Sequence, residues 1–318
     1  MILEACYFLI WLIVLSWAAD RFVFGASALA KNIGVSPMII GLTIVAMGSS
    51  APEIMVAATA SFNGNTDTAV GNALGSNITN IALVLGITAL LKPLSIASST
   101  LKKEMPVLLL VSLLAVYFLS DYFLLKMEGI ILITLFFVVI GGLTWVSFNM
   151  EKDDLLQSET ESEIPSGVPT SKAIIWLVLG IILLPLSAHF MVDSAEVIAR
   201  YFGLSELVIG LTIIAIGTSL PELAACIAGV LKNEDDLVLG NIIGSNIFNL
   251  LAVLAMPGLI APGIVDENAA TRDSYVMLGL TMLLLIFSFN LKGSRCINRV
   301  EGFGLISCFL VYQYLLFS

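Results

Sequence analysis

The chain carries one segment twice, and this duplication constrains its fold more than any other feature. Residues 40–54 read IGLTIVAMGSSAPEI, and residues 209–223 read IGLTIIAIGTSLPEL. Residues 71–80 (GNALGSNITN) and 240–249 (GNIIGSNIFN) match at the same offset of 169 residues, since 209 − 40 and 240 − 71 are equal. Chance similarity between apolar segments gives shared Leu and Val, whereas these copies share Ser, Asn and Glu, which are rare in membrane spans. The chain is therefore built from two copies of one unit.

The composition is that of a membrane protein. Of the 318 residues, 58% are hydrophobic and 12% are charged, whereas a soluble domain has about 25% charged residues. Ten apolar stretches have about the length that a membrane span needs. They are 2–24, 37–61, 68–91, 105–120, 126–148, 173–198, 206–231, 237–260, 274–291 and 302–317. We expect an all-α polytopic membrane protein with ten transmembrane helices.

The repeat divides the chain into two halves of five spans each. We expect an N-terminal half at 1–148 with the first repeat at about 37–91, and a C-terminal half at 173–318 with the second at about 206–260. The segment 149–172 is acidic and contains Ser, Pro and Gly, which predicts a flexible cytoplasmic linker. Because five is odd, the two copies enter the membrane from opposite sides. Inverted repeats with interrupted helices are typical of secondary transporters.

Lysine and arginine residues orient the chain. With ten spans, the loops on one side contain far more of them than the loops on the other. The richer side has Arg21, Lys31, Lys92, Lys102, Lys103, Lys152, Lys172, Lys232, Lys292, Arg295 and Arg299, and the poorer side has Lys126, Arg200 and Arg272. The positive-inside rule makes the richer side cytoplasmic, so both termini face outward. We interpret the protein as a multi-pass protein of a prokaryotic inner (plasma) membrane.

Several classes of function are excluded by composition. The formal net charge is −10, which argues against nucleic-acid binding. His189 is the one histidine, so a multi-histidine metal site is excluded, and the four cysteines lack the spacing of a zinc site. We expect no cofactor and no obligate protein partner beyond the lipid bilayer and the transported ions. His189 aligns with Asp20 in the repeat; we interpret it as a solvated side chain, with a role in pH sensing left open.

Two carboxylates lie in the middle of predicted spans, at equivalent positions of the repeat. A charged Glu53 or Glu222 at that depth costs a few kcal/mol, and such residues are functional by default. Ser49 and Ser50 precede Glu53 by one helical turn. Thr218 and Ser219 precede Glu222 in the same way.

The helices that carry these carboxylates are predicted to be broken. Pro52 and Pro221 lack an N–H group and disrupt the preceding turn, which frees backbone carbonyl oxygens near Ala46 and Ala215. An unwound backbone at membrane depth is tolerated where it lines a cavity or binds something.

The next span of each repeat adds further oxygen atoms. Ser76 and Asn80 are four residues apart and share a helix face, as do Ser245 and Asn249. The neighbouring Asn77 and Asn246 are expected to point elsewhere and to be structural. Gly71 and Gly75, like Gly240 and Gly244, have the spacing that lets helices approach closely.

Carboxylates, amide oxygens, hydroxyls and carbonyls are hard donors that suit Ca²⁺, Na⁺ or Mg²⁺ rather than zinc or copper. Ca²⁺ accepts six to eight oxygens in flexible geometry, whereas Mg²⁺ demands strict octahedral order. Two negative charges balance one Ca²⁺ or two Na⁺, which is the equivalence that an exchanger needs.

At these motifs the chain resembles the sodium/calcium exchanger branch of the cation/calcium exchanger superfamily, in its prokaryotic form. The family motif G-[ST]-S-x-P-E appears at 48–53 and 217–222, and G-S-N-x-x-N/D appears at 75–80 and 244–249. The resemblance implies electrogenic exchange of Na⁺ for Ca²⁺ by alternating access, in which the first spans of the two halves slide against a core formed by the repeats.

The resemblance also implies roles for individual residues. Glu53 and Glu222 would be the central ligands shared by Ca²⁺ and Na⁺, with Asn80 and Asn249 at the centre of the cluster. The sodium sites would be completed by Ser50, Thr218, Ser219, Ser76 and Ser245, with the carbonyl groups of Ala46 and Ala215. Two positions depart from the common pattern: Ser49 where Thr is common, and Asn249 where some prokaryotic relatives have Asp. The second removes a titratable group and disfavours a proton-coupled cycle.

Other functions remain as alternatives. The nearest is a Ca²⁺/H⁺ or K⁺-dependent antiporter on the same scaffold. A cation channel is disfavoured because inverted broken helices are typical of alternating access. An intramembrane hydrolase that uses Ser49 or Ser50 lacks an evident base, because a nucleophile needs one beside it. Asp20, Asp193 and Glu196 are interpreted as charges at the membrane interface.

Overall fold

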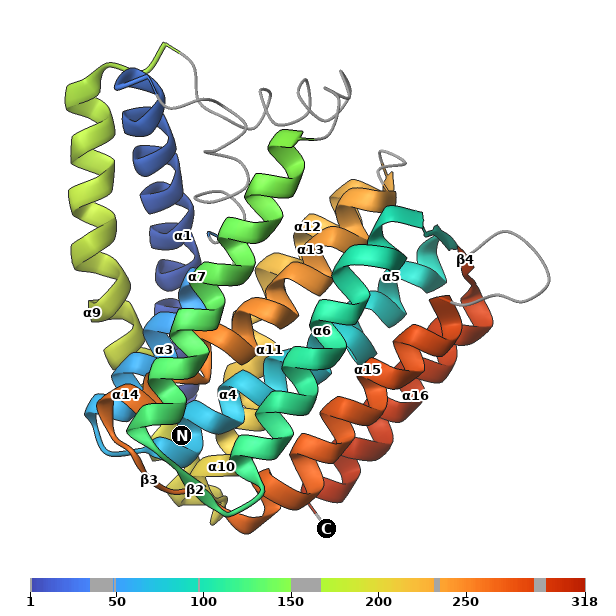
Figure 1. Ribbon diagram of the computed structural model, residues 1–318. Helices are drawn as coiled ribbons and strands as arrows, with labels where there is room; N and C mark the ends of the chain where they lie inside the picture. Colours follow the sequence, from blue (N-terminus) through green and yellow to red (C-terminus); the bar gives the residue numbers. More distant parts are fainter. Residues whose placement is uncertain are drawn as a thin grey trace.

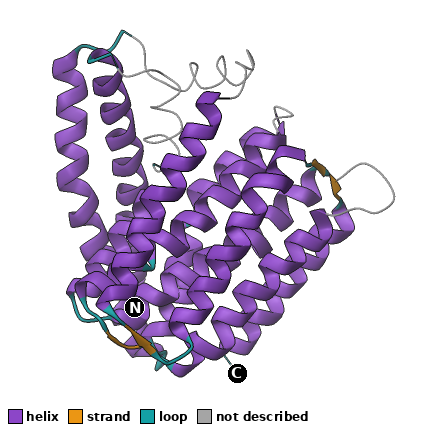
Figure 2. Cartoon of the chain, in the orientation of Figure 1, coloured by secondary structure: helices purple, strands orange, loops and turns teal. Residues whose placement is uncertain are grey.

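The computed structural model describes residues 2–34, 48, 50–96, 98–149, 167–231, 235–288 and 296–317. These residues form a bundle of helices with two small strand pairs at its opposite ends (Figure 2). The predicted linker lies largely outside the described residues, as do positions 35–47 at the start of the second span.

The first half contains six α-helices, a π-helical segment labelled η2 and two strands among its described residues. They are α1 (Ile2–Asn32), α3 (Ala51–Phe62), α4 (Thr66–Ile78), η2 (Thr79–Val84), α5 (Leu85–Leu91), β1 (Leu94–Ser95), α6 (Ser98–Leu119), β2 (Phe123–Leu124) and α7 (Lys126–Asn149).

The second half repeats this order, with three π-helical segments. Its described elements are α9 (Thr170–Phe202), α10 (Glu206–Ile209), η3 (Gly210–Ile214), α11 (Ala215–Thr218), α12 (Leu220–Leu231), α13 (Asp235–Phe248), η4 (Asn249–Val253), α14 (Ala255–Ile260), β3 (Gly263–Ile264), η5 (Ala269–Asp273), α15 (Ser274–Ser288), β4 (Cys296–Ile297) and α16 (Arg299–Leu316).

Helices occupy all ten predicted stretches wherever the chain is described, which confirms the ten-helix fold. Six of them are long and apolar enough to cross a membrane by length and composition alone, and Glu104–Leu119 is a shorter apolar helix. The predicted boundary of the first span was wrong. Helix α1 continues past residue 24 to Asn32, so Arg21, counted above as a loop residue, lies inside the helix.

The first helix of each half stands beside its counterpart, and α1 and α9 form a pair at one edge of the bundle (Figure 1). Their backbones approach closely, because a Cβ atom at Gly25 would lie 2.6 Å from the nitrogen of Leu177. The rings of Trp11 and Phe190 stack with centroids 4.7 Å apart. The outer face of the pair is apolar and exposed, for example at Ile13, as expected for a surface that meets lipid.

The centre of the bundle is formed by the two repeats. In α4, every residue from Thr68 to Ile78 is buried. A Cβ atom at Gly71 would lie 2.7 Å from the carbonyl oxygen of Leu207, and one at Gly75 would lie 2.7 Å from the Cα atom of Leu211. The predicted close helix approach is therefore confirmed for the first pair of glycines.

The equivalent approach at the second pair stays a prediction. No described residue lies within 4 Å of a Cβ atom built at Gly240 or Gly244. The residues that the repeat would place there, 38–42, lie outside the described part of the chain.

Two short antiparallel sheets join the halves at opposite ends of the bundle (Figure 2). Strand β1 of the first half pairs with β4 of the second, with Ser95 opposite Cys296. Strand β2 of the first half pairs with β3 of the second. Beside the first sheet, Nζ of Lys92 lies 2.8 Å from Oδ1 of Asp235. Each end of the molecule is thus fastened by contacts between the halves.

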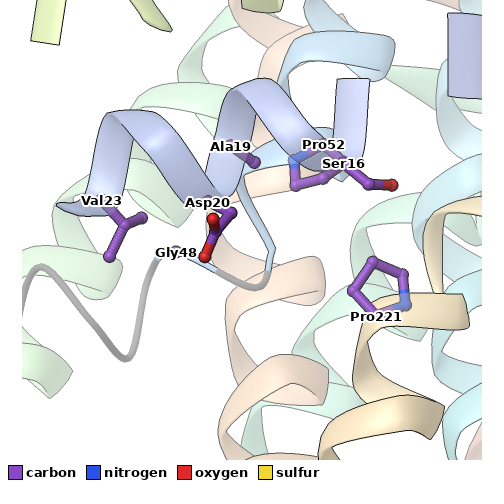
Figure 3. Close-up of a pocket in the computed structure, with 7 residues that line it drawn as sticks. All are labelled: Ser16, Ala19, Asp20, Val23, Gly48, Pro52 and Pro221. Carbon is purple, nitrogen blue, oxygen red and sulfur yellow. The ribbon is translucent and has the colours of Figure 1, made fainter. Parts of the chain in front are cut away.

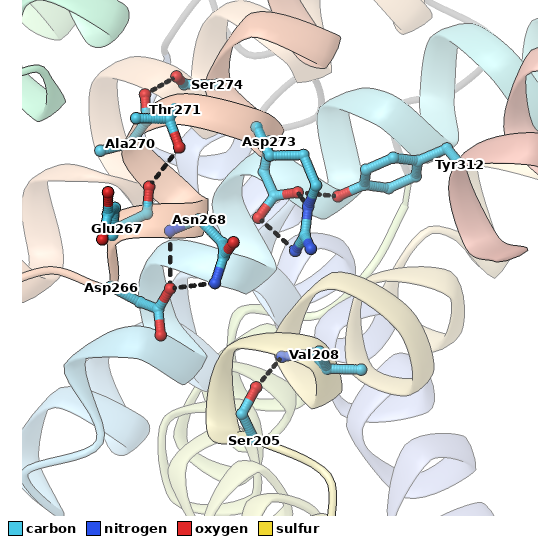
Figure 4. Close-up of polar contacts among 11 residues, drawn as sticks. Ser205, Val208, Asp266, Glu267, Asn268, Ala270, Thr271, Asp273, Ser274 and Tyr312 are labelled. Atoms are coloured by element: carbon cyan, nitrogen blue, oxygen red, sulfur yellow. Dashed lines mark hydrogen bonds and ion pairs between the residues drawn. The ribbon is translucent and has the colours of Figure 1, made fainter. Parts of the chain in front are cut away.

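A buried polar cluster holds the start of α15 against α16 (Figure 4). Asp273 is fully buried, and its Oδ1 accepts hydrogen bonds from Nε of Arg272 at 2.7 Å and from the hydroxyl group of Tyr312 at 3.0 Å. The charge of this carboxylate is therefore compensated locally.

Candidate cation site

Each repeat has a residue with non-helical backbone angles shortly before its glutamate. In the first repeat α3 begins at Ala51, and Ser50 before it has the non-helical angles φ −92° and ψ 8°. In the second, α11 ends at Thr218, Ser219 has φ −85° and ψ 1°, and α12 begins at Leu220. The predicted break is confirmed in the second repeat, whereas the chain before Ser50 in the first repeat lies almost entirely outside the described residues. Pro52 and Pro221 both lie in the first turn of the helix that follows, where a missing N–H group is harmless.

Glu53 and Glu222 are both completely buried, and the two carboxyl groups interact electrostatically with each other. Neither carboxylate oxygen of Glu53 has a hydrogen-bond partner among the described residues. Burial of an uncompensated carboxylate costs several kcal/mol. A cation or a proton at Glu53 would remove this cost.

The surrounding polar side chains also have oxygen atoms without protein partners. Seven candidate residues carry such a buried atom in the described structure: Ser50, Glu53, Ser76, Asn80, Ser219, Ser245 and Asn249. Buried polar groups in proteins are almost always hydrogen-bonded, and each exception calls for an explanation. Both repeats therefore carry buried polar atoms that a ligand could satisfy.

The asparagine of each second motif lies in a π-helical segment. Asn80 belongs to η2, and Asn249 opens η4, where its carbonyl oxygen accepts the N–H group of Leu254, 2.9 Å away. Such segments insert one extra residue into a turn and are frequent at functional sites. No pattern in the sequence predicted these π-helical segments.

Two further asparagines belong to the site. The Nδ2 of Asn80 donates to Oδ1 of Asn246 at 3.2 Å, so Asn246, which we expected to point elsewhere, contacts the cluster from the other repeat. Asn72, which we did not select, is fully buried. Its Nδ2 donates to the carbonyl oxygen of Glu53 at 3.1 Å, and its Oδ1 accepts from Thr218 Oγ1 at 3.4 Å. Its presence in both copies, as Asn72 and Asn241, was the signal that could have identified it.

Of the two carbonyl groups that were expected to be free, only that of Ala215 belongs to a described residue. Ser49 and Ala46 lie outside the described residues. The carbonyl oxygen of Ala215 is not free: it accepts the N–H group of Ser219 at 3.1 Å and the hydroxyl group of Thr218 at 3.4 Å. We expected Pro221 to leave this carbonyl unpaired. That expectation is wrong, because the backbone forms a further hydrogen-bonded turn from Ala215 to Ser219 before α12 begins.

The donor set is that of a hard cation. Within the described residues no group of three His, Cys, Asp or Glu side chains gathers as a metal cluster. The site instead combines two carboxylates with neutral hydroxyl and amide oxygens. Such a set suits Na⁺ and Ca²⁺ better than a transition metal.

Ten helices in two inverted repeats around a buried pair of carboxylates define a secondary transporter. Residues 3–145 and 172–318 match the sodium/calcium exchanger protein family. The chain belongs to this family, and it is an antiporter rather than an enzyme.

Known proteins match the chain over nearly its whole length. It is 57% identical to the putative antiporter CaxA of Alkalimonas amylolytica over 318 residues, with 100% of both chains covered. It is 42% identical to the inner membrane protein YrbG of Escherichia coli strain K12, with 100% of this chain and 98% of that protein covered. The solved structure of the sodium–calcium exchanger NCX_Mj, soaked with Na⁺ and Sr²⁺, has 32% identity, a TM-score of 0.65 and 98% coverage of both chains.

Proposed function

We propose that this antiporter exchanges Na⁺ for Ca²⁺, with Glu53 and Glu222 as the central ligands shared by both ions. The observation that carries the proposal is the buried pair of carboxylates at equivalent positions of the two repeats, where Glu53 forms no ion pair with a cationic side chain of the described residues. The name of the relative NCX_Mj, a sodium–calcium exchanger, supports the choice of ions.

The proposed ligands divide between the two repeats. Ca²⁺ binds between the two carboxylates, which supply two negative charges for its two positive ones. Na⁺ ions use the same carboxylates together with the hydroxyl and amide oxygens that lack protein partners. The carbonyl group of Ala46 and the hydroxyl groups of Ser49 and Thr218 complete these sites.

Exchange follows from competition for one pair of charges. Because the buried carboxylates repel each other, the empty site is strained and does not move through the membrane without cations. Occupation by one Ca²⁺ or by at least two Na⁺ neutralises the pair. Competition for this pair of charges is therefore sufficient to couple the movement of the two ions, and the cycle needs no cofactor.

The proposed movement is a displacement of the α1–α9 pair against the repeats. The pair supports this role because its two helices contact each other along their length and stand at one edge of the bundle (Figure 1). The remaining helices of the two halves, in contrast, are joined at both ends by the two small sheets. Alternating exposure of one site is the behaviour expected of inverted repeats.

We also propose a location and an orientation. The protein resides in a prokaryotic inner membrane, as the name of the relative YrbG indicates for that protein. The excess of lysine and arginine on one side places the linker in the cytoplasm and both termini outside. In Figure 1 both termini lie at the end of the bundle that holds β2 and β3, as an even number of spans requires.

The test is Ca²⁺ uptake into sealed vesicles that contain the purified protein, loaded with Na⁺ and diluted into Na⁺-free buffer. We expect uptake that requires internal Na⁺ and that grows when the vesicle interior is made positive. Such voltage dependence means that more than two Na⁺ leave for each Ca²⁺, because net charge then crosses the membrane potential. Uptake that is unaffected by Na⁺ contradicts the proposal.

The same vesicles test the nearest alternative, a Ca²⁺/H⁺ or K⁺-dependent antiporter. A pH gradient or a K⁺ gradient without Na⁺ is imposed, and Ca²⁺ uptake is followed. We expect neither gradient to drive uptake by itself. Uptake with a pH gradient alone would retain the same carboxylates and assign the coupling to H⁺.

A further inference from the structure

A cavity of about 190 Å³ adjoins both helix breaks. Ser16 and Asp20 of α1 line it on one side, and Gly48, Pro52 and Pro221 line it on the other (Figure 3). One water molecule takes about 30 Å³ in the liquid, so the cavity has room for several waters. It lies directly beside the prolines that open the helices of Glu53 and Glu222.

Asp20 gives this cavity its charge. Of the described residues that line it, Asp20 has the one charged side chain, which is 64% exposed. Figure 3 shows its carboxylate turned toward Gly48. Helix α1 continues for twelve residues beyond Asp20, to Asn32. Asp20 thus lies inside helix α1 rather than at its end, and its interpretation as a charge at the membrane interface stays a prediction.

The partner of Asp20 is the next residue of the same helix. The Nη2 of Arg21 lies 2.6 Å from Oδ2 of Asp20, and the guanidinium carbon lies 5.5 Å from the ring centroids of Phe24 and Trp176. Exposed ion pairs of this kind are weak, about 0–1 kcal/mol. Because this ion pair is weak, a mobile cation can displace the Arg21 guanidinium group from the carboxylate of Asp20.

Pro221 lines the cavity, but Gly217, on the other side of the second break, is covered by α1. A Cβ atom at Gly217 would lie 3.2 Å from Cδ2 of Leu12 and 3.7 Å from Cζ of Phe8. Both side chains are apolar and buried. Helix α1 therefore presents a carboxylate to the first break and an apolar cover to the second. In the proposed orientation, Gly48 lies on the cytoplasmic side of Glu53, and Gly217 lies on the outer side of Glu222.

We propose that Asp20 forms an access subsite, in which a hydrated Ca²⁺ or Na⁺ ion is held on the cytoplasmic side before it passes between the breaks to the buried carboxylates. This inference rests on the proposed exchange function. A partly exposed carboxylate in a cleft raises the local concentration of cations without stripping their water. Its attraction for Ca²⁺ is twice that for Na⁺, because Coulomb energy is proportional to charge.

The test compares Asp20→Asn with the unchanged protein in vesicles of known orientation, with KM measured at each face. We expect the KM for cytoplasmic Ca²⁺ to rise about three- to tenfold, and the KM for cytoplasmic Na⁺ by about the square root of that factor. The maximal rate and both KM values at the outer face stay unchanged. The difference shrinks as choline chloride is added, because salt screens an exposed charge.

Two further variants separate a local charge from a structural effect. Asp193→Asn removes a half-exposed carboxylate of α9 outside this cavity and should leave the cytoplasmic KM unchanged. Arg21→Gln removes the competing cation and should lower the cytoplasmic KM for Ca²⁺. Damage to α1 would change the cytoplasmic KM in the same direction in both variants. A rise in Asp20→Asn and a fall in Arg21→Gln therefore indicate an effect of charge.

The outcomes are distinguishable. Equal KM changes at both faces, or unchanged KM values in both cavity variants of an active exchanger, overturn the access subsite. If Asp20→Asn does not fold, the sign of the Arg21→Gln effect decides. Absence of Na⁺-driven Ca²⁺ uptake by the unchanged protein would instead overturn the proposed exchange function.

Discussion

Asn80 and Asn246 meet across the boundary between the two repeats, with Nδ2 of the first 3.2 Å from Oδ1 of the second. This hydrogen bond fixes the orientation of the Asn80 amide group. Its Oδ1 is buried and has no protein partner in the described structure, so it is available to a cation. Asn246 therefore orients a proposed ligand that belongs to the opposite repeat.

We predict that Asn246→Leu weakens Ca²⁺ binding about tenfold, because a lost buried hydrogen bond of about 1–2 kcal/mol lets the Asn80 amide rotate. Equilibrium Ca²⁺ binding to the purified protein measures the effect. Asn241→Leu is the matched control: it lies on the same helix, and its Nδ2 contacts Sγ of Cys226 rather than the cluster. Equal losses in both variants would mean that Asn246 acts only through packing.

The second prediction concerns the stability of the empty site. Glu53→Gln removes a buried carboxylate whose oxygens lack partners, so we expect the thermal unfolding temperature without ions to stay equal or to rise. We also expect Ca²⁺ to stop raising that temperature. In the unchanged protein, Ca²⁺ at 100 times its Kd should add about 2.7 kcal/mol of stability.

Tryptophan fluorescence during heating, with and without Ca²⁺, checks both parts of this prediction. A large fall of the unfolding temperature in the ion-free Glu53→Gln variant would show that the carboxylate is satisfied by the protein itself. Retention of full Ca²⁺ stabilisation would remove Glu53 from the ligand set.

The third prediction tests the packing of the two repeats. Gly71→Ala places a methyl group 2.7 Å from the carbonyl oxygen of Leu207, which belongs to the backbone and cannot turn away. We expect the variant to assemble poorly and to unfold at lower temperature, because overpacking costs about 1–3 kcal/mol.

Gly279→Ala is the control for this substitution, since no described atom lies within 4 Å of a Cβ atom there. Its unfolding temperature should stay the same or rise, because Ala favours a helix over Gly by about 1 kcal/mol. Size-exclusion profiles and heating curves compare the two variants. Equal behaviour would contradict the close approach of α4 and α10.

The fourth prediction uses a native cysteine. Ser95 and Cys296 are opposite one another in the β1–β4 pair, and opposed Cα atoms of antiparallel strands are about 4.5–5.5 Å apart, within the range of a disulfide. Ser95→Cys should therefore form a disulfide with Cys296 upon oxidation. Because this sheet belongs to the part that is proposed not to move, transport should persist.

Burial raises the pKa of the Cys296 thiol. Oxidation should therefore be slow near neutral pH and faster as the pH rises, since the thiolate is the reactive form. To detect the disulfide, a protease site is inserted into the linker and the protein is cut there. The two halves then migrate together on a denaturing gel until a reducing agent is added. Leu94→Cys is the control, because its partner in the register is Ile297 rather than Cys296.

The sequence was sufficient for the features that depend on periodicity and duplication. The ten spans followed from hydrophobic stretches, the inversion from an odd number of spans between copies, and the helix breaks from Pro52 and Pro221. These signals are local or repeated, so one chain is enough to read them. The family that the motifs suggested is confirmed by the match over both halves.

Other features depend on contacts that no local pattern encodes. The π-helical segment at Asn249 depends on where an extra residue fits against neighbouring helices, and the contact of Asn80 with Asn246 depends on how the two repeats dock. Apolar residues on both sides of Arg21 gave no boundary, so the continuation of α1 to Asn32 was missed. The position of Asp20 beside the breaks required the helices to be placed against each other.

The two small sheets have a consequence for biosynthesis. Strands β1 and β2 belong to the half that is synthesised first, and their partners β4 and β3 belong to the half that follows. Until the second half is synthesised, the backbone N–H and C=O groups of β1 and β2 therefore have no partner strand, one at each end of the bundle. Closure of each sheet then marks the moment when the late half has arrived in the inverted orientation, and a second half inserted the wrong way round would leave both edges open to quality-control proteases.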